Sequence, residues 1–311
     1  MRILVYGAGV IGCQLAHMLH RAGNDVVLLA RGEWKDILDK NGLVIRHYVQ
    51  LHTTVDRLST IEALAPEDVY DIIFVAMQYG QVDRVLPIIA VNQSRSIVLI
   101  GNNMEADVSA RILSASATEK ELAFGFQATG GRRENGKVIS VHASVGMTIG
   151  GLHAPLTEAF RKHLEKAFAG VTYRLTWEEN MDAWLKCHMA FILPFAYICY
   201  ATDFKLSKAT KHQRHTAIAA ALEGYAVLRK LGYPIRPANS EAALTDNRGN
   251  IRALLWVMAK TPIGRLAASD HCKNAAAEMT ALDDAFEKLR KQSGVLAPHW
   301  NALRGEGQPH L

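Results

Sequence analysis

Three glycines near the N-terminus have the spacing of a dinucleotide-binding loop. Gly7, Gly9 and Gly12 form a G-x-G-x-x-G pattern directly after an apolar run, residues 2–6. In this pattern the first glycine allows a tight turn, the second lets the backbone approach a pyrophosphate, and the third lets a helix pack against the strand. The start of that helix offers free N–H groups and a positive dipole end to phosphates. The spacing therefore favours a cofactor loop over a purely structural glycine turn.

The residues after the motif complete a strand–helix–strand unit. Val10, Leu15 and Leu19 recur at helical intervals as far as Gly23, and residues 26–30 form a second apolar run. Glycines placed between a strand and a helix in this way are typical of a Rossmann-type unit. The predicted cofactor-binding segment consists of Gly7, Ala8, Gly9, Val10, Ile11 and Gly12.

The second predicted strand leads into a basic residue. NAD-binding units carry an Asp or Glu about twenty residues after the glycines, where it binds the ribose 2′-hydroxyl. This chain has Arg31 there, and its first acid is Glu33. A guanidinium can pair with a 2′-phosphate and stack on adenine. We therefore expect NADP(H) rather than NAD(H); the alternative is an ordinary solvated arginine at a strand end.

Composition indicates a globular protein without nucleic-acid or membrane partners. The chain has 311 residues, 49% of them hydrophobic and 21% charged, and its net charge is +5. That length allows two substantial cores, and no nucleic-acid-binding motif accompanies the modest basic charge. The longest apolar run, residues 189–201, is too short to span a bilayer and predicts a buried helix.

Neither the cysteines nor the histidines form a metal-binding pattern. The four cysteines lie in helical patterns without C-x-x-C spacing, which is typical of reduced thiols in the cytoplasm. We expect His188 to be a packed or surface residue, and no metal to be bound. The remaining histidines considered as ligands are scattered along the chain: His17, His20, His47 and His142.

The order of the predicted elements gives the fold class. Strands and helices alternate at first, short β-like runs follow between residues 122 and 151, and only helices follow from about residue 178. The alternation predicts an α/β fold: a Rossmann-type doubly wound parallel sheet with an antiparallel extension, followed by an all-α C-terminal domain. The expected domains are residues 1–177 and 178–311, with the active site in the cleft between them. The predicted helices are residues 34–40, 82–90, 155–169, 179–201, 217–231, 240–259 and 273–292, and the later strands are 42–45, 71–76, 96–100, 123–126, 138–142, 147–150 and 171–175.

The sequence resembles the ketopantoate reductase (2-dehydropantoate 2-reductase) family over nearly its whole length. The order and spacing of several short segments carry the resemblance. These segments are the VxLLARG end of the second strand, the Asn-Gly-Leu turn at residues 41–43, Ile-Gly-Asn at 100–102, Gly-Arg-Arg at 131–133, Ala-Trp-Leu-Lys at 183–186, and a late helix that contains Glu278 and ends in Ser-Gly-Val at 293–295.

Lys186 matches the catalytic lysine of that family. It lies in an otherwise apolar helix, where an unpaired ammonium is costly to bury, so it must either extend to the surface or serve a site. Ketone reduction creates an alkoxide, which needs a proton donor and a positive charge. A protonated lysine supplies both, which favours catalysis over an amphipathic-helix lysine.

The resemblance implies further site residues. Glu278 matches the acidic partner that binds the substrate hydroxyl or holds the lysine, and we expect Asn274 and His271 on the same helix face. Asn102 follows a sheet strand, where its amide can bridge the nicotinamide ribose and the substrate. Gln78 stands where the family has a cofactor-side lysine. The alternatives without a functional role are that Glu278 is a solvent-facing glutamate and that Asn102 is a turn-forming asparagine.

The expected substrate pocket departs from the family pattern. The two asparagines that the family places one and two turns after the lysine are Ala190 and Pro194 here, and no serine matches near Arg265 and Leu266. Each lost hydrogen bond to a substrate would cost about 1–3 kcal/mol. A bulkier or less polar carbonyl compound is therefore as expected as ketopantoate itself.

The expected function is an NADPH-dependent reductase that transfers a hydride to the keto group of a small 2-oxo acid. Two alternatives stay open at this point: a related dehydrogenase for another oxo acid, hydroxy acid or imine, and a non-catalytic NADP(H)-binding protein. The expected partner is a small-molecule carbonyl substrate, and the apolar surface of the helical domain would suffice for a homodimer.

Overall fold

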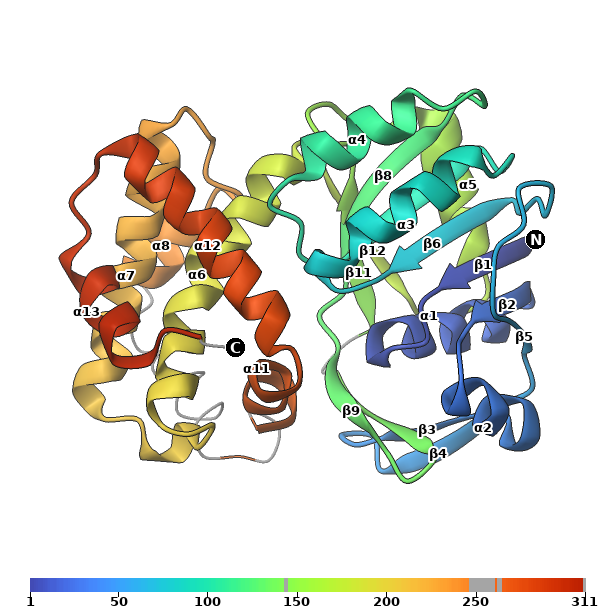
Figure 1. The fold of residues 1–311 in the computed structure, drawn as a ribbon, viewed down its shortest axis with the longest axis horizontal. Helices are drawn as coiled ribbons and strands as arrows, with labels where there is room; N and C mark the ends of the chain where they lie inside the picture. Colours follow the sequence, from blue (N-terminus) through green and yellow to red (C-terminus); the bar gives the residue numbers. More distant parts are fainter. Residues whose placement is uncertain (143–144, 246–260, 262–264, 310–311) are drawn as a thin grey trace. The chain divides into compact units, whose positions relative to one another are not determined.

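A computed structural model describes residues 1–142, 145–245, 261 and 265–309 of the chain. The chain divides into two compact units (Figure 1). The first contains residues 1–101 and 105–181, and the second contains residues 102–104 and 182–311.

The first unit contains an eight-stranded sheet with a Rossmann-type strand order. Six parallel strands follow the order β5-β2-β1-β6-β7-β8, and β11 and β12 extend the sheet beyond β8. β11 runs antiparallel to β8 and parallel to β12, which gives the expected antiparallel extension. The strands are β1 (Arg2–Tyr6), β2 (Asp25–Leu29), β5 (Ser59–Ile61), β6 (Ile72–Ala76), β7 (Ser96–Ile100), β8 (Glu121–Phe126), β11 (Gly146–Gly150) and β12 (Arg174–Glu178).

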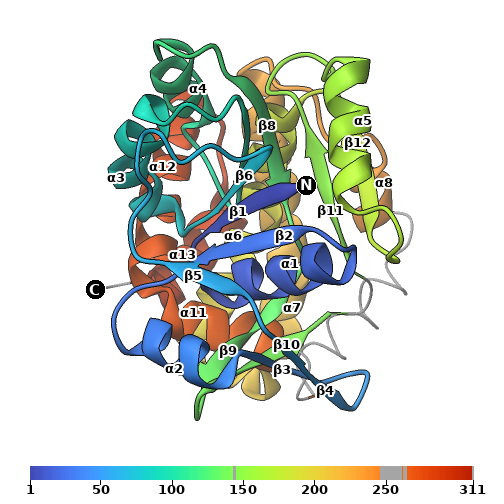
Figure 2. The ribbon, with the colours of Figure 1, turned by 90° about the vertical axis from the view of Figure 1, so that its right-hand side faces the viewer.

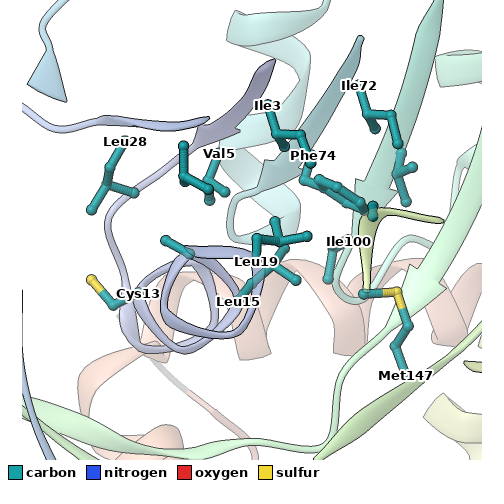
Figure 3. Packing of buried hydrophobic residues seen from close by; sticks show 14 of the residues in the cluster. Ile3, Val5, Cys13, Leu15, Leu19, Leu28, Ile72, Phe74, Ile100 and Met147 are labelled. Carbon is teal, nitrogen blue, oxygen red and sulfur yellow. The ribbon is translucent and has the colours of Figure 1, made fainter. Parts of the chain in front are cut away.

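Helices cover both faces of this sheet, as a doubly wound fold requires. α1 (Val10–Arg21) and α5 (Glu158–Ala167) lie on one face, and α3 (Tyr79–Val91) and α4 (Ala106–Ser114) lie on the other (Figure 2). Side chains alternate along each strand, so Ile3 and Val5 of β1 pack toward α1. Leu15 and Leu19 of α1 meet them in the core (Figure 3). This packing fixes the direction of α1 and hence the position of the glycine loop before it.

A second sheet lies on the far side of α1. Its order is β4-β3-β10-β9, and α1 contacts both sheets (Figure 1). β3 pairs in parallel with β10, although about ninety residues separate them in sequence. The strand prediction at 138–142 was therefore right in type, but this strand joins the second sheet instead of extending the first. The additional elements are β3 (Leu43–His47), β4 (His52–Asp56), β9 (Gly130–Glu134), β10 (Lys137–Val141) and the helix α2 (Glu33–Asn41).

The described part of the second unit is helical, as the sequence predicts. Trp300 is fully buried there and stacks on Phe286 at a centroid distance of 4.6 Å. Its helices are α6 (Met181–Ala201), α7 (Lys211–Lys230), α8 (Ser240–Thr245), α11 (Asp270–Asn274), α12 (Ala276–Ser293) and α13 (Pro298–Gly307), with the short turns η1 (Leu206–Lys208) and η2 (Arg265–Ser269).

One predicted helix in this unit differs from the structure, and part of another lies outside the described residues. The predicted helix at 273–292 is broken, because Ala275 (φ −124°, ψ 36°) separates α11 from α12. Of the predicted helix at 240–259, residues 246–259 lie outside the described residues, and α8 covers the start.

Helix α6 is long and apolar enough to cross a membrane by length and composition, and it is the one such helix among the described residues. However, 72% of its apolar window is buried inside the protein, as in the core helix of a folded domain. Its residues Ala183, Leu193 and Tyr197 are all fully buried.

Candidate active and cofactor-binding site

The glycine loop has the close backbone approaches that its spacing predicts. Gly7 has φ of +117°, and a Cβ there would overlap the carbonyl oxygen of Ala76 at the end of β6. A Cβ on Gly12 would overlap the carbonyl oxygen of Gly7. In contrast, a Cβ on Gly9 would meet nothing within 4 Å. Gly7 and Gly12 are therefore needed to fold the loop, whereas the space at Gly9 is open for a ligand.

The N-terminus of α1 is also suited to an anion. Gly9 is its N-cap, no side chain caps it, and its first turn contains no acid. The first N–H groups of a helix have no intrahelical acceptor and carry the positive end of the helix dipole. A pyrophosphate at this position would be bound by those groups.

Gly9→Ala separates binding from folding. We expect its free energy of unfolding to stay within about 1 kcal/mol of wild type, because Gly9 has an ordinary φ of −77° and its Cβ meets no atom. NADPH affinity should fall at least tenfold, about 1.4 kcal/mol, because the methyl group occupies the pyrophosphate space. Urea denaturation and fluorescence titration measure the two quantities. Equal NADPH affinity in the variant would mean that the loop binds no pyrophosphate.

Arg31 follows β2 at the carboxyl edge of the sheet, and its guanidinium is held in place. Its Nη2 donates to the hydroxyl of Tyr6 at 3.2 Å, and its Nε donates to the carbonyl oxygen of Glu62 at 3.3 Å. The residue as a whole is exposed. These contacts orient the guanidinium and leave its Nη1 without a described hydrogen-bond partner.

Gln78 is the N-cap of α3, directly after β6. β6 pairs with β1, so Gln78 and the glycine loop follow neighbouring strands at the same edge of the sheet. Its side-chain oxygen accepts weakly from Gln81 Nε2 at 3.5 Å. The structure therefore places Gln78 near the glycine loop as a neutral, hydrogen-bonding residue.

Lys186 does not extend to the surface. It is 4% exposed and forms a buried ion pair with Asp182, one helical turn earlier on α6. Its Nζ also lies 4.9 Å from the centre of the Tyr233 ring. The amphipathic-helix alternative is therefore excluded, because the ammonium is enclosed between an acid and an aromatic face. Asp182 was not predicted as a site residue, although it lies four residues before Lys186, where side chains on a helix are neighbours.

Glu278 is buried as well and contacts two of the expected residues. It is 5% exposed; its Oε1 accepts from Asn102 Nδ2 at 3.4 Å, and its Oε2 lies 3.6 Å from His271 Nε2. The carboxylate fixes the amide orientation of Asn102, since only the NH₂ group can donate to it. Asn102 Oδ1 is then buried without a partner among the described residues. A buried unsatisfied acceptor is costly, and a bound O–H or N–H group would satisfy it.

Asn274 is not brought to this group. It is exposed at the end of α11, and Ala275 interrupts the helix between it and Glu278. The expected common face relied on an unbroken helix. The structure brings His271 to Glu278 instead.

The positions of the missing asparagines are packed. Ala190 is fully buried, and a Cβ on Gly224 of α7 would lie 2.9 Å from the Ala190 Cβ. Pro194 is also buried within α6. At Ala190, α6 packs against α7 in place of presenting a polar group. The departure at Pro194 has no explanation in the structure beyond its burial.

The histidines of the first unit are not scattered in space. The ring centroid of His47 lies 5.0 Å from that of His17, 4.5 Å from His52 and 5.9 Å from His142. Burial and the neighbouring imidazoles lower the pKa of His47 to about 4. This cluster could not be predicted from the sequence, because it depends on the long-range pairing of β3 with β10. That pairing brings His47 and His142 together. Among the described residues, no group of three His, Cys, Asp or Glu side chains could hold a metal ion.

The free energy of unfolding should therefore fall in mild acid. Between pH 6.5 and 4 the unfolded chain binds a proton at residue 47 that the folded chain does not, so stability is full above about pH 6.5 and falls with pH. We expect a loss of about 2–3 kcal/mol from His47 between pH 7 and 4.5. Denaturation at both pH values measures it. His47→Gln should flatten the dependence, and exposed His212→Gln should not; an unchanged slope in His47→Gln would contradict the assignment.

Comparison with known proteins assigns the chain to a family. Residues 3–153 match the family described as "Ketopantoate reductase PanE/ApbA". The "Uncharacterized oxidoreductase YkpB" of Bacillus subtilis (strain 168) is 30% identical over 247 residues, which cover 78% of this chain and 79% of that protein. The chain belongs to the PanE/ApbA ketopantoate reductase family. Members of this family are oxidoreductases that act on keto or hydroxy groups.

A curated relative and a solved structure are also similar to this chain. A "2-dehydropantoate 2-reductase" of Pyrococcus abyssi (strain GE5 / Orsay) is 24% identical over 191 residues, 60% of this chain and 59% of that protein. The chain thus spans about six tenths of that relative's length. The solved structure of D-mandelate dehydrogenase with NADH and anilino(oxo)acetate has the same fold, with a TM-score of 0.74 and 16% identity over 98% of this chain and 96% of the other. The family neighbours bind nicotinamide cofactors.

Proposed function

We propose that the protein is an NADPH-dependent reductase that transfers a hydride to the keto group of a small 2-oxo acid. The observation that carries this proposal is the buried Lys186, enclosed by Asp182 and Tyr233, in a family of keto- and hydroxy-group oxidoreductases. The alternative of a non-catalytic NADP(H)-binding protein explains neither the buried lysine nor the unsatisfied Asn102 acceptor.

The described residues fit a nicotinamide dinucleotide. The open space at Gly9 and the uncapped start of α1 suit its pyrophosphate, and the oriented Arg31 suits a 2′-phosphate. When bound, the reduced nicotinamide supplies the hydride. NADP(H) is favoured over NAD(H) because no acid stands at position 31, and a carboxylate there is what selects a free 2′-hydroxyl.

In the proposed mechanism, Lys186 donates its proton to the oxygen of the substrate carbonyl as the alkoxide forms. Asp182 acts as a positioning residue, because the buried ion pair holds the ammonium in one place. Asn102 accepts a hydrogen bond from the substrate or the ribose through Oδ1, while Glu278 holds its amide group. The proton donor and the hydrogen-bond acceptor are thus preorganised.

A second candidate function is a reductase or dehydrogenase for a less polar 2-oxo or hydroxy acid. The buried Ala190 and Pro194 favour it, because they cannot bind the polar groups that family asparagines would hold. A panel of 2-oxo acids, with NADPH consumption as the readout, separates the two functions. A preference for ketopantoate supports the first, and a preference for a branched or aromatic 2-oxo acid supports the second. NADPH binding without oxidation in the presence of any member would support the non-catalytic alternative.

We further propose that the protein acts in the cytoplasm, in accord with its four buried free cysteines. Its proposed partner is the small carbonyl substrate, and its proposed assembly is a homodimer.

A further inference from the structure

A cavity of about 350 Å³ lies in the first unit, away from the cofactor residues. It shares no described residue with the glycine loop, Arg31 or Gln78. We call it the histidine pocket. Among the described residues that line it, Gln14, His17, His47 and His142 are buried, and His52 and Arg174 are exposed.

Two buried side chains of the histidine pocket have no hydrogen-bond partner within the part of the chain that the structure describes. Gln14 is fully buried, and both atoms of its amide are unsatisfied among the described residues. His142 is 5% exposed, and both of its ring nitrogens are also unsatisfied. Buried polar groups are costly to leave unpaired, and buried amides and imidazoles almost always have partners. Two such residues lining one cavity indicate a ligand with polar atoms.

The arrangement of the rings argues against a metal ion. His17 Nδ1 is 2.6 Å from Asp56 Oδ2, and His47 Nε2 is 2.9 Å from Thr54 Oγ1, so one nitrogen of each ring is already engaged. His47 and His52 stack with an interplanar angle of 22°. Stacked rings direct their nitrogens side by side, whereas a metal needs ligand atoms converging at about 2.1 Å.

We propose that the histidine pocket binds a small organic anion, either a carboxylate or a phosphate ester. Arg174 supplies a fixed positive charge at the rim, and imidazoles and the Gln14 amide supply N–H donors inside. Asp56 contacts the cluster through His17 at 2.6 Å, and Arg21 pairs with its other oxygen at 2.9 Å. Met18 and Val145 add apolar surface for the body of the ligand.

The charge balance of the cluster supports this ligand class. Burial and the charges of neighbouring imidazoles lower the pKa of His47 and of His142. In the absence of a counter-ion, these imidazoles therefore disfavour each other's protonation. A bound anion would offset that repulsion, because its negative charge favours the protonated form of a neighbouring imidazole.

The proposal does not rest on the proposed function, and NMR of the histidine rings tests it directly. Inorganic phosphate and butyrate are titrated separately into the full-length protein at pH 6, with excess NADP⁺ present to occupy the cofactor loop. We expect saturable shifts of ring resonances with at least one probe. Saturation by phosphate alone would identify a phosphate ester, and saturation by butyrate alone would identify a carboxylate.

Matched variants localise the site. The double variant His52→Ala/Arg174→Ala changes only exposed side chains. We expect it to weaken binding of the probe and so to raise the dissociation constant at least tenfold. The double variant His212→Ala/Arg111→Ala, which also replaces an exposed histidine and arginine, should bind as wild type does. The proposal fails if neither probe saturates, or if both double variants bind as tightly as wild type.

Discussion

Lys186→Ala is expected to lower the turnover number by about 10²–10⁴-fold, the usual contribution of a general acid. NADPH binding should be unchanged, because the glycine loop and Arg31 belong to the other unit. The substitution also leaves the buried Asp182 carboxylate without its cation, which typically costs about 3–5 kcal/mol of stability. Steady-state kinetics, a cofactor titration and a denaturation curve measure the three effects separately.

A matched double variant separates chemistry from folding. Lys186→Met/Asp182→Asn replaces the buried ion pair by two neutral side chains of similar size, so it should recover much of the lost stability. It has no proton donor, and we expect it to be as inactive as Lys186→Ala. The exposed Lys230→Ala should behave as wild type. Normal turnover in the double variant would show that the ion pair is structural and would end the assignment of Lys186.

Arg31→Asp is expected to lower the affinity for NADPH by about 10–100-fold and to leave the affinity for NADH nearly unchanged. The arginine would lose its charge-assisted hydrogen bonds to a 2′-phosphate, worth about 1.5–3 kcal/mol, and the new carboxylate would repel that phosphate. The new carboxylate would also accept a hydrogen bond from the free 2′-hydroxyl of NADH. Titration of both cofactors into wild type, Arg31→Asp and the exposed control Arg111→Asp gives the ratio. Equal loss for NADPH and NADH would mean that Arg31 does not select the cofactor.

The fold could largely be predicted because its strongest signals are local. The glycine spacing, the apolar strands and the helical periodicity all act within about thirty residues, and alternating strands and helices predict a parallel sheet. The short edge strand β5 was not predicted. The second sheet could not be predicted. β3 pairs with β10 across the sequence, and nothing local to either strand distinguishes it from a strand of the main sheet.

Several residues of the candidate site could be proposed from the sequence, but their contacts could not. Lys186 stood out as a charge within an apolar helical pattern, Glu278 was proposed from the family resemblance, and both are buried. The ion pair between Lys186 and Asp182 joins residues four apart on one helix, a spacing that is visible in the sequence. In contrast, the hydrogen bond between Asn102 and Glu278 joins segments that are distant in the sequence. Asn274 was misplaced because the break at Ala275 leaves no clear sequence signal: alanine is the best helix former.

The prediction of the substrate depends on how α6 packs against α7, which the sequence does not show. Ala190 is fully buried, and a Cβ on Gly224 of α7 would lie 2.9 Å from the Ala190 Cβ. A sequence comparison shows only that the asparagine is missing. The structure shows that the position has become part of the contact between α6 and α7.

Transfer of a labelled hydride tests the central claim most directly. NADPH that carries deuterium at the transferring position of its nicotinamide is mixed with the protein and with each 2-oxo acid in turn, and the hydroxy acid product is examined by mass spectrometry. The proposed function predicts one deuterium on the former keto carbon in wild type and none in Lys186→Met/Asp182→Asn. Absence of label from every product, while NADPH still binds, would contradict it.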